Sequence, residues 1–177
     1  MQNGSYREMR TERLFLRTLT EADVKVVRNF FQQEEEFETN QAALAWIRRI
    51  NKRRDMQVIG GAVNFYVWLL DTDQFIGRVY IHKKAELDGE VEIGYGISGE
   101  YRNKGYATEA AKALVRFAFE QVGLGELCAI VRPENTASRR VIEKLGFSYC
   151  GIRTVADIGA DWAYDYFRLS RDDFLSW

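Results

Sequence analysis

The sequence has little of several features that would point to particular classes of protein. It holds one proline, two cysteines and one histidine among 177 residues. Cys128, Cys150 and His82 lie too far apart in the chain for the usual zinc-ligand spacings, so we expect no metal site. No run approaches about 18 apolar residues, and the polar start, Met1 to Arg10, does not resemble a signal peptide. These absences predict a reduced, cytoplasmic protein with no membrane partner.

An excess of one charge sign is also missing. The 25 basic and 26 acidic residues leave a formal net charge of −1. A general nucleic-acid binder carries a clear basic excess, so we expect no nucleic-acid partner. The sequence also lacks internal repeats and linkers rich in glycine, serine or proline. The chain, residues 1–177, is therefore expected to form one domain.

Apolar patterns with strand and helix periods alternate along the chain. Strands are expected at 12–17, 62–70, 75–82, 90–98, 126–131, 147–155 and 161–169. Helices are expected from Thr20 onward and at 42–50, 105–121 and 136–145. The order β-α-α-β-β-β-α-β-α-β-β combines a hairpin meander with a βαβ unit. It predicts an α/β (α+β) fold: a single mixed, mostly antiparallel seven-stranded sheet with helices on both faces.

A basic loop with one glycine joins the strand expected at 91–98 to the helix expected at 105–121. A helix N-terminus offers unpaired N–H groups and the positive end of its dipole, so it favours anions. Successive loop amides can form a concave nest for phosphate oxygens, and Gly105 permits a close backbone approach. The order Lys104-Gly105-Tyr106 excludes a Walker-type P-loop, which needs Gly-Lys-Ser/Thr. A plain strand-to-helix turn is the alternative interpretation.

Four segments resemble motifs of the GNAT superfamily of acetyl-CoA-dependent N-acetyltransferases. Residues Arg102 to Ala107 match the pattern Arg/Gln-x-x-Gly-x-Gly/Ala. The serine three positions after Asn135, followed by the Glu-Lys-Leu-Gly-Phe run at 143–147, is typical of the RimJ/RimL-type branch, the ribosomal-protein alanine N-acetyltransferases and their relatives. The opening Thr11 to Arg17 and the strand Glu92 to Tyr95 are similar to that branch. Because the matches follow in order over most of the chain, the resemblance implies the GNAT fold.

The resemblance also implies that acetyl-CoA is the co-substrate and that no metal takes part. In the family, the strand that corresponds to residues 90–98 splays from its parallel neighbour, and pantetheine lies in the space between them. Backbone groups near Gly96 and Ile97 would therefore pair with pantetheine. One N–H there would polarise the thioester carbonyl. The pyrophosphate would lie on the loop and first helical turn, formed by Arg102, Asn103, Lys104, Gly105, Tyr106, Ala107 and Thr108. Asn135 and Ser138 would complete the cofactor site, although Asn135 can be simply a helix N-cap.

Two residues are candidates for catalysis. Glu92 is a carboxylate in a largely apolar strand, which is costly unless it is hydrated or paired. By resemblance it is the general base, and a structural carboxylate that orders a loop is the alternative. Many GNAT enzymes carry a tyrosine seven positions after the asparagine as the acid for the thiolate, but Ile142 stands there. In the RimJ/RimL-type branch the serine is proposed to meet the sulfur instead, which gives that role to Ser138.

We therefore predict an N-acetyltransferase in which a primary amine attacks the thioester directly in a ternary complex. The favoured acceptor is a protein or peptide N-terminal amine. The alternatives are a small amine, such as a polyamine, an aminoglycoside or an amino acid, and a coenzyme A-binding regulator without turnover. The acidic run Glu34 to Glu38 could attract a cationic amine, or could be a solvated turn. His82 is expected at the surface, with a catalytic role as the alternative. A homodimer is expected from the family alone.

Overall fold

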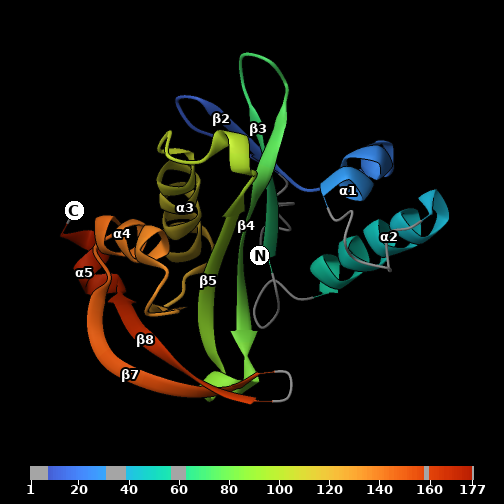
Figure 1. The fold of residues 1–177 in the computed structure, drawn as a ribbon. Coiled ribbons are helices and arrows are strands. Elements are labelled where there is room, and N and C mark those ends of the chain that lie inside the picture. The colour runs from blue at the N-terminus through green and yellow to red at the C-terminus, as the bar shows by residue number, and fades with distance from the viewer. Residues whose placement is uncertain (1–7, 31–38, 57–62, 158–159, 177) are drawn as a thin grey trace.

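The fold is built on one mixed sheet (Figure 1). The computed structural model describes residues 8–30, 39–56, 63–157 and 160–176. Over these residues the sheet has eight strands in the order β1-β2-β3-β4-β5-β6-β8-β7. The strands are β1 (Glu8–Arg10), β2 (Leu14–Arg17), β3 (Val63–Leu69), β4 (Phe75–Lys84), β5 (Glu90–Ile97), β6 (Glu126–Val131), β7 (Ser148–Asp157) and β8 (Ala160–Ser170).

Neighbouring strands are antiparallel except for β5 and β6, which are parallel. The prediction of a mixed, mostly antiparallel sheet is confirmed. The expected number of seven strands is wrong, because the three-residue β1 pairs with β2 at the sheet edge. A strand this short has too few residues to display an alternating pattern.

Helices cover both faces of the sheet, as predicted (Figure 1). They are α1 (Val24–Phe30), α2 (Asn40–Met56), α3 (Tyr106–Arg116), α4 (Thr136–Lys144) and the short α5 (Arg171–Leu175). Alternate residues of β3 divide between the two faces. Phe65 and Val67 belong to the core beneath α3, whereas Tyr66 and Trp68 pack with Ile47 of α2. Each face of the sheet therefore has its own apolar cluster.

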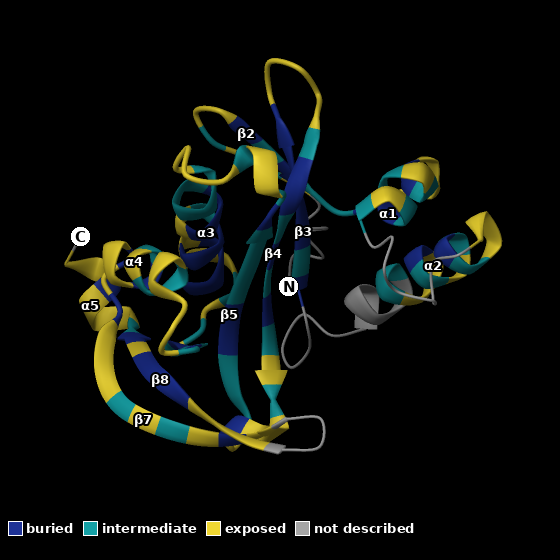
Figure 2. Ribbon diagram, viewed as in Figure 1, coloured by how far each residue is buried: buried dark blue, intermediate teal, exposed yellow. Residues whose placement is uncertain are grey.

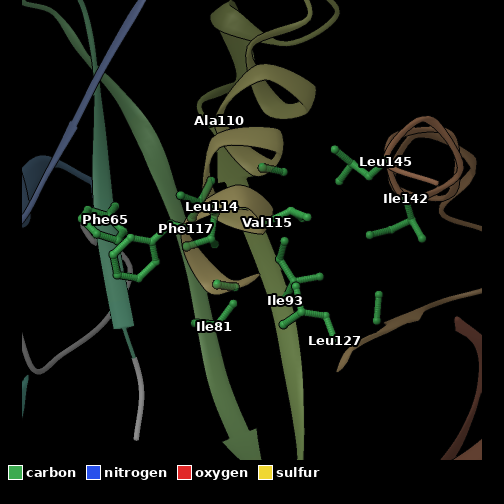
Figure 3. Packing of buried hydrophobic residues seen from close by; sticks show 14 of the residues in the cluster. Phe65, Ile81, Ile93, Ala110, Leu114, Val115, Phe117, Leu127, Ile142 and Leu145 are labelled. Carbon is green, nitrogen blue, oxygen red and sulfur yellow. The ribbon is translucent and has the colours of Figure 1, made fainter. Parts of the chain in front are cut away.

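The larger cluster lies between the sheet and α3 (Figure 3). Ala110 and Ala111 are fully buried, and such small side chains let α3 approach the strands closely. Phe117, in the π-helical turn Phe117–Val122 that continues α3, packs edge-on against Phe65, with ring centroids 5.2 Å apart. Buried positions line β3 to β5 and the inner side of α3, while β7 is mostly exposed (Figure 2). This packing fixes the N-terminus of α3 relative to β5.

Most predicted elements agree with the observed ones to within a few residues. The prediction for 126–131 coincides with β6, whereas α2 runs well beyond the predicted 42–50, to Met56. The C-terminal helix α5 was not predicted. The acidic run Glu34 to Glu38 lies outside the described residues. Among the helices of the described part of the chain, none is long and apolar enough to cross a membrane.

Candidate active site

The two parallel strands of the sheet, β5 and β6, separate along their length. They pair at Glu92 and Cys128. From Ile93 to Ile97, β5 pairs with β4 alone. The side of β5 that faces β6 therefore has no paired strand at the C-terminal end of β5, which leaves a gap in the middle of the sheet.

The two glycines of β5 have different surroundings. A Cβ added at Gly94 would lie 2.2 Å from the Cζ atom of the Tyr80 ring, so a side chain there would collide with the tyrosine. A Cβ added at Gly96 would meet nothing within 4 Å. Gly94 therefore allows a close approach by Tyr80, whereas Gly96 borders open space in the gap.

A cleft of about 520 Å³ occupies the end of this gap. It lies between the C-terminal end of β5, the loop before α3, the first turn of α3 and one side of α4. Its lining includes ten residues that the sequence predicted for the cofactor, namely Gly96, Ile97, Arg102, Asn103, Gly105, Tyr106, Ala107, Thr108, Asn135 and Ser138. Segments about 40 residues apart in the chain thus converge on one cleft, as the motifs predicted.

Lys104, also predicted for the cofactor, is not part of that lining. Its carbonyl accepts a hydrogen bond from Arg13, and its Nζ lies 5.4 Å from the centroid of the Tyr101 ring. Two basic residues of α4 that the prediction missed, Arg140 and Lys144, do line the cleft. They are four residues apart, which places them on one helix face, and this spacing was a readable signal.

The loop before α3 bends through two residues with left-handed backbone conformations. Asn103 has φ 60° and Gly105, the N-cap of α3, has φ 83°. Arg102 closes the loop by donating from Nε to the carbonyl of Ile97 at 3.0 Å. The first N–H groups of α3 have no acceptor within the helix, so they remain available for a ligand in the cleft. Unpaired helix N–H groups next to cationic side chains are an arrangement that suits an anion.

Glu92 lies at the point where the two strands separate, and is 7% exposed. Its Oε2 atom is 3.4 Å from Nε2 of His82 and 3.5 Å from Nζ of Lys84. Burial lowers the pKa of His82 and Lys84 lowers it further, while the Glu92 charge opposes both effects. The imidazole is therefore neutral near pH 7, and Lys84 is the cation that balances Glu92. His82 is only partly at the surface, because its side chain is 31% exposed and lies against Glu92.

Ser138 lies on the other side of β5, in contact with Tyr95. The Tyr95 hydroxyl donates to the Ser138 carbonyl at 3.0 Å and lies 2.9 Å from its Oγ. Burial raises the pKa of Tyr95 to about 12, so the phenol stays protonated. Asn135 is the N-cap of α4 and accepts from the Ser138 N–H at 3.0 Å. Ile142 is 1% exposed in the core and offers no acid. Tyr95 was not among the predicted site residues.

Four other aromatic residues, Trp46, Trp68, Trp162 and Tyr164, lie outside the lining of this cleft. Trp68 and Tyr164 are buried in separate apolar clusters, and Trp46 packs against the cluster of Trp68. Trp162 is 43% exposed, and the guanidinium of Arg132 lies 4.1 Å from its ring centroid. Trp46, Trp68 and Tyr164 therefore serve packing.

Comparison with known proteins identifies the class. Residues 13–148 match the family model described as the acetyltransferase (GNAT) domain. The protein named "Uncharacterized N-acetyltransferase p20" of Bacillus licheniformis is 30% identical over 150 residues, which cover 80% of this chain and 83% of p20. The chain belongs to the GNAT family of acetyltransferases, enzymes that use acetyl-CoA.

Two further similarities concern the branch within the family. YdaF of Bacillus subtilis, provisionally named a ribosomal N-acetyltransferase, is 33% identical over 79 residues, 45% of this chain and 43% of YdaF. The ribosomal-protein-S5-alanine acetyltransferase of Vibrio fischeri has the same fold, with a TM-score of 0.79 at 19% identity over 94% of this chain and 98% of that one. These names are of the RimJ/RimL type that the sequence motifs resemble.

Proposed function

We propose that this acetyltransferase moves the acetyl group of acetyl-CoA to the α-amine of a protein or peptide N-terminus by direct attack in a ternary complex. One observation carries the proposal: the cleft beside the C-terminal end of β5 runs from the loop before α3 to Tyr95 and Ser138, and the buried Glu92 lies three residues back along the same strand. A long thioester with a pyrophosphate at one end fits such a passage. An amine can then reach the thioester from the Glu92 side.

Different residues of the cleft would bind different parts of acetyl-CoA. The amides after Arg102, the N-terminus of α3, and the cations Arg140 and Lys144 would hold the pyrophosphate. Backbone groups at Gly96 and Ile97 would pair with pantetheine and present an N–H to the thioester carbonyl. Asn135 contributes indirectly, because its side chain caps α4 and so orients Ser138.

Glu92 would take the proton of the attacking amine, through a water molecule. A peptide α-amine with a pKa of about 7.8 costs less than about 1 kcal/mol to deprotonate near neutral pH, whereas a lysine-like amine with a pKa of about 10.4 costs about 4 kcal/mol. Ser138, held beside Tyr95, would stabilise the departing thiolate by a hydrogen bond. A thiol pKa near 8.5 means that modest help suffices.

A covalent acyl-enzyme is not part of this proposal. Cys128 is the cysteine near Glu92, and it is 1% exposed. Burial raises its pKa to about 12, and the charges of Glu90 and Glu92 add to the effect. A thiol in this state is a poor nucleophile at neutral pH, because the thiolate is the reactive form.

The charges around Glu92 favour an α-amine over a polyamine. Lys84 balances Glu92, and Arg153 forms ion pairs with both Glu90 and Asp88. Since these three carboxylates already have cationic partners, they provide little negative field for a polycation. The names of the ribosomal-protein relatives support the same choice of acceptor.

The test is thiol release from acetyl-CoA with a panel of acceptors. The panel contains peptides that begin with Ser or Ala, the same peptides with acetylated N-termini, polyamines, aminoglycosides and free amino acids. We expect release with the free peptides and none with their acetylated counterparts. Thiol release with polyamines or aminoglycosides alone would show that the acceptor is a small amine and not a peptide N-terminus. If no acceptor of the panel gives thiol release but the protein still binds coenzyme A, a regulator without turnover is favoured.

A further inference from the structure

The opening motif of the chain packs against the start of α3, nearly a hundred residues later. Three donors from this segment converge on the carboxylate of Glu109. The Thr11 hydroxyl donates to Oε1 at 2.6 Å, the Arg13 N–H donates to Oε1 at 2.9 Å, and Arg13 Nε donates to Oε2 at 2.7 Å. The Arg13 guanidinium is thereby fixed beside the first turn of α3.

From that position Arg13 also reaches the loop. Its Nη1 atom donates to the carbonyl of Lys104 at 3.0 Å, and its guanidinium lies 4.6 Å from the ring centroid of Tyr106. A Cβ added at Gly105 would come within 3.3 Å of Nη2. Arg13 therefore contacts Lys104 and Tyr106 and lies beside Gly105, where the loop meets α3.

The hydrogen bond to Lys104 fixes the direction of one peptide group. The carbonyl of Lys104 and the N–H of Gly105 belong to the same planar trans peptide, so they point in opposite directions. When the carbonyl faces Arg13, the N–H faces the other side of the loop, where Gly105 lines the cleft. If that peptide turned over, it would present a carbonyl oxygen, which repels phosphate.

We propose that Arg13, held by Glu109, is a positioning residue that keeps the Gly105 N–H directed at the pyrophosphate subsite. This inference rests on the proposed function, because it assumes that the loop binds pyrophosphate. Arg13 acts through the loop and contacts no reacting atom. The opening motif, Thr11 to Arg17, thus takes part in cofactor binding although it is distant in sequence from the loop.

Two other roles for the same contacts make different predictions. A purely structural tether would affect stability, or all activities equally. A purely electrostatic role would follow the sign of the charge. Replacing Glu109 with the neutral Gln removes a negative charge near the anion site, which by charge alone strengthens pyrophosphate binding. The positioning role predicts weaker binding instead, because Gln does not hold the guanidinium as an ionised carboxylate does.

The experiment compares acetyl-CoA with acetyl-pantetheine, which has the thioester but no pyrophosphate. The wild-type enzyme should prefer acetyl-CoA in kcat/KM, and absence of that preference would refute the pyrophosphate site itself. In Glu109→Gln and Arg13→Lys we expect kcat/KM for acetyl-CoA to fall about tenfold. The kcat for acetyl-CoA and the kcat/KM for acetyl-pantetheine should be unchanged.

Arg13→Lys keeps the charge, but a lysine cannot present a rigid fork to Glu109 and Lys104 together. If Glu109→Gln does not fold, Arg13→Lys alone still tests the proposal. The matched control is Arg116→Gln, which removes an exposed pair with Glu120 (3.5 Å) at the far end of α3 and should leave the substrate preference intact. Equal losses with both substrates, or stronger acetyl-CoA binding in Glu109→Gln, would overturn the proposal.

Discussion

The residues of β5 have different proposed roles that depend on the face of the sheet on which each side chain lies. Glu92 lies on one face beside His82 and Lys84, and Tyr95 lies on the other beside Ser138. Because successive side chains of a strand alternate, three residues of separation place these groups on opposite faces of the sheet. One strand can thus serve the amine on one side and the thiolate on the other.

Replacing Glu92 by Gln keeps the shape and removes the proton acceptor. We expect the rate at pH 7 to fall by about tenfold or less and to recover as the pH rises above about 7.8, where the α-amine is already neutral. The pH–rate profile of kcat with a peptide acceptor measures this. Glu86→Gln, an exposed carboxylate on the same side, is the control and should behave as wild type. If the pH–rate profile of Glu92→Gln equals that of the wild type, Glu92 is not the general base.

The two glycines of β5 provide a matched pair for stability. Ala at position 94 would collide with the Tyr80 ring, so we expect Gly94→Ala to lower the free energy of unfolding by about 1–3 kcal/mol. Ala at position 96 meets nothing within 4 Å and should leave stability nearly unchanged. Urea unfolding of both variants compares them. Equal losses would show that the Tyr80 contact does not restrict position 94.

At the scale of elements, one ion pair joins the end of β2 to the start of α1. Arg17 donates to both carboxylate oxygens of Asp23 at 2.8 Å, and the Thr20 N–H donates to Oδ2 at 2.7 Å. Burial would raise the pKa of Asp23, but Arg17 and Thr20 outweigh it, so the pKa lies below its ordinary value. Arg17 also covers Trp68, at 3.8 Å from the ring centroid. The pair therefore orients the start of α1 on the face of the sheet that carries Trp68.

We expect Asp23→Asn to lower the free energy of unfolding by about 2–3 kcal/mol at pH 7. A carboxylate whose pKa is depressed by folding stabilises the protein above its unfolded pKa, about 3.9, and loses this contribution as the pH falls through the folded value. The difference between wild type and Asp23→Asn should thus be constant from pH 7 to about 4 and shrink below that. Urea unfolding at several pH values tests it. A constant difference down to pH 2 would contradict the ionic origin.

How far the sequence predicted the elements depends on their length and pattern. The short continuous apolar run Leu127 to Val131 located β6 to the residue, because a run of this length is typical of a buried strand. The apolar pattern did not extend the second helix to Met56, since the polar stretch after Ile50 has no apolar period. β1 and α5 hold three and five residues, too few for either period to appear.

The candidate site was predicted where it is local in sequence. The loop and α4 carry their residues within short motifs, and these residues line one cleft. Contacts between distant segments were beyond the sequence. Nothing local indicates that Arg13 meets Glu109, that His82 pairs with Glu92, or that the Tyr95 phenol meets Ser138. Such pairs depend on strand register and helix docking, which a single sequence does not specify.

At the scale of the whole molecule, the sheet places every part of the proposed reaction around one gap. The parallel pair β5 and β6 interrupts an otherwise antiparallel sheet, and its divergence opens the passage. The net charge of −1 gives no strong overall field for steering substrates. Selection of the acceptor must therefore come from the local groups on the Glu92 side.

Mass spectrometry of acetylated peptides measures the proposed reaction most directly. Peptides beginning with Ser or Ala and containing one internal lysine are incubated with enzyme and acetyl-CoA, and the modified nitrogen is located by fragmentation. We expect one acetyl group on the α-amine, none on the lysine, and none on the same peptides with blocked N-termini. Acetylation of the lysine, or of a polyamine added in competition, with the α-amine untouched would contradict N-terminal acetylation.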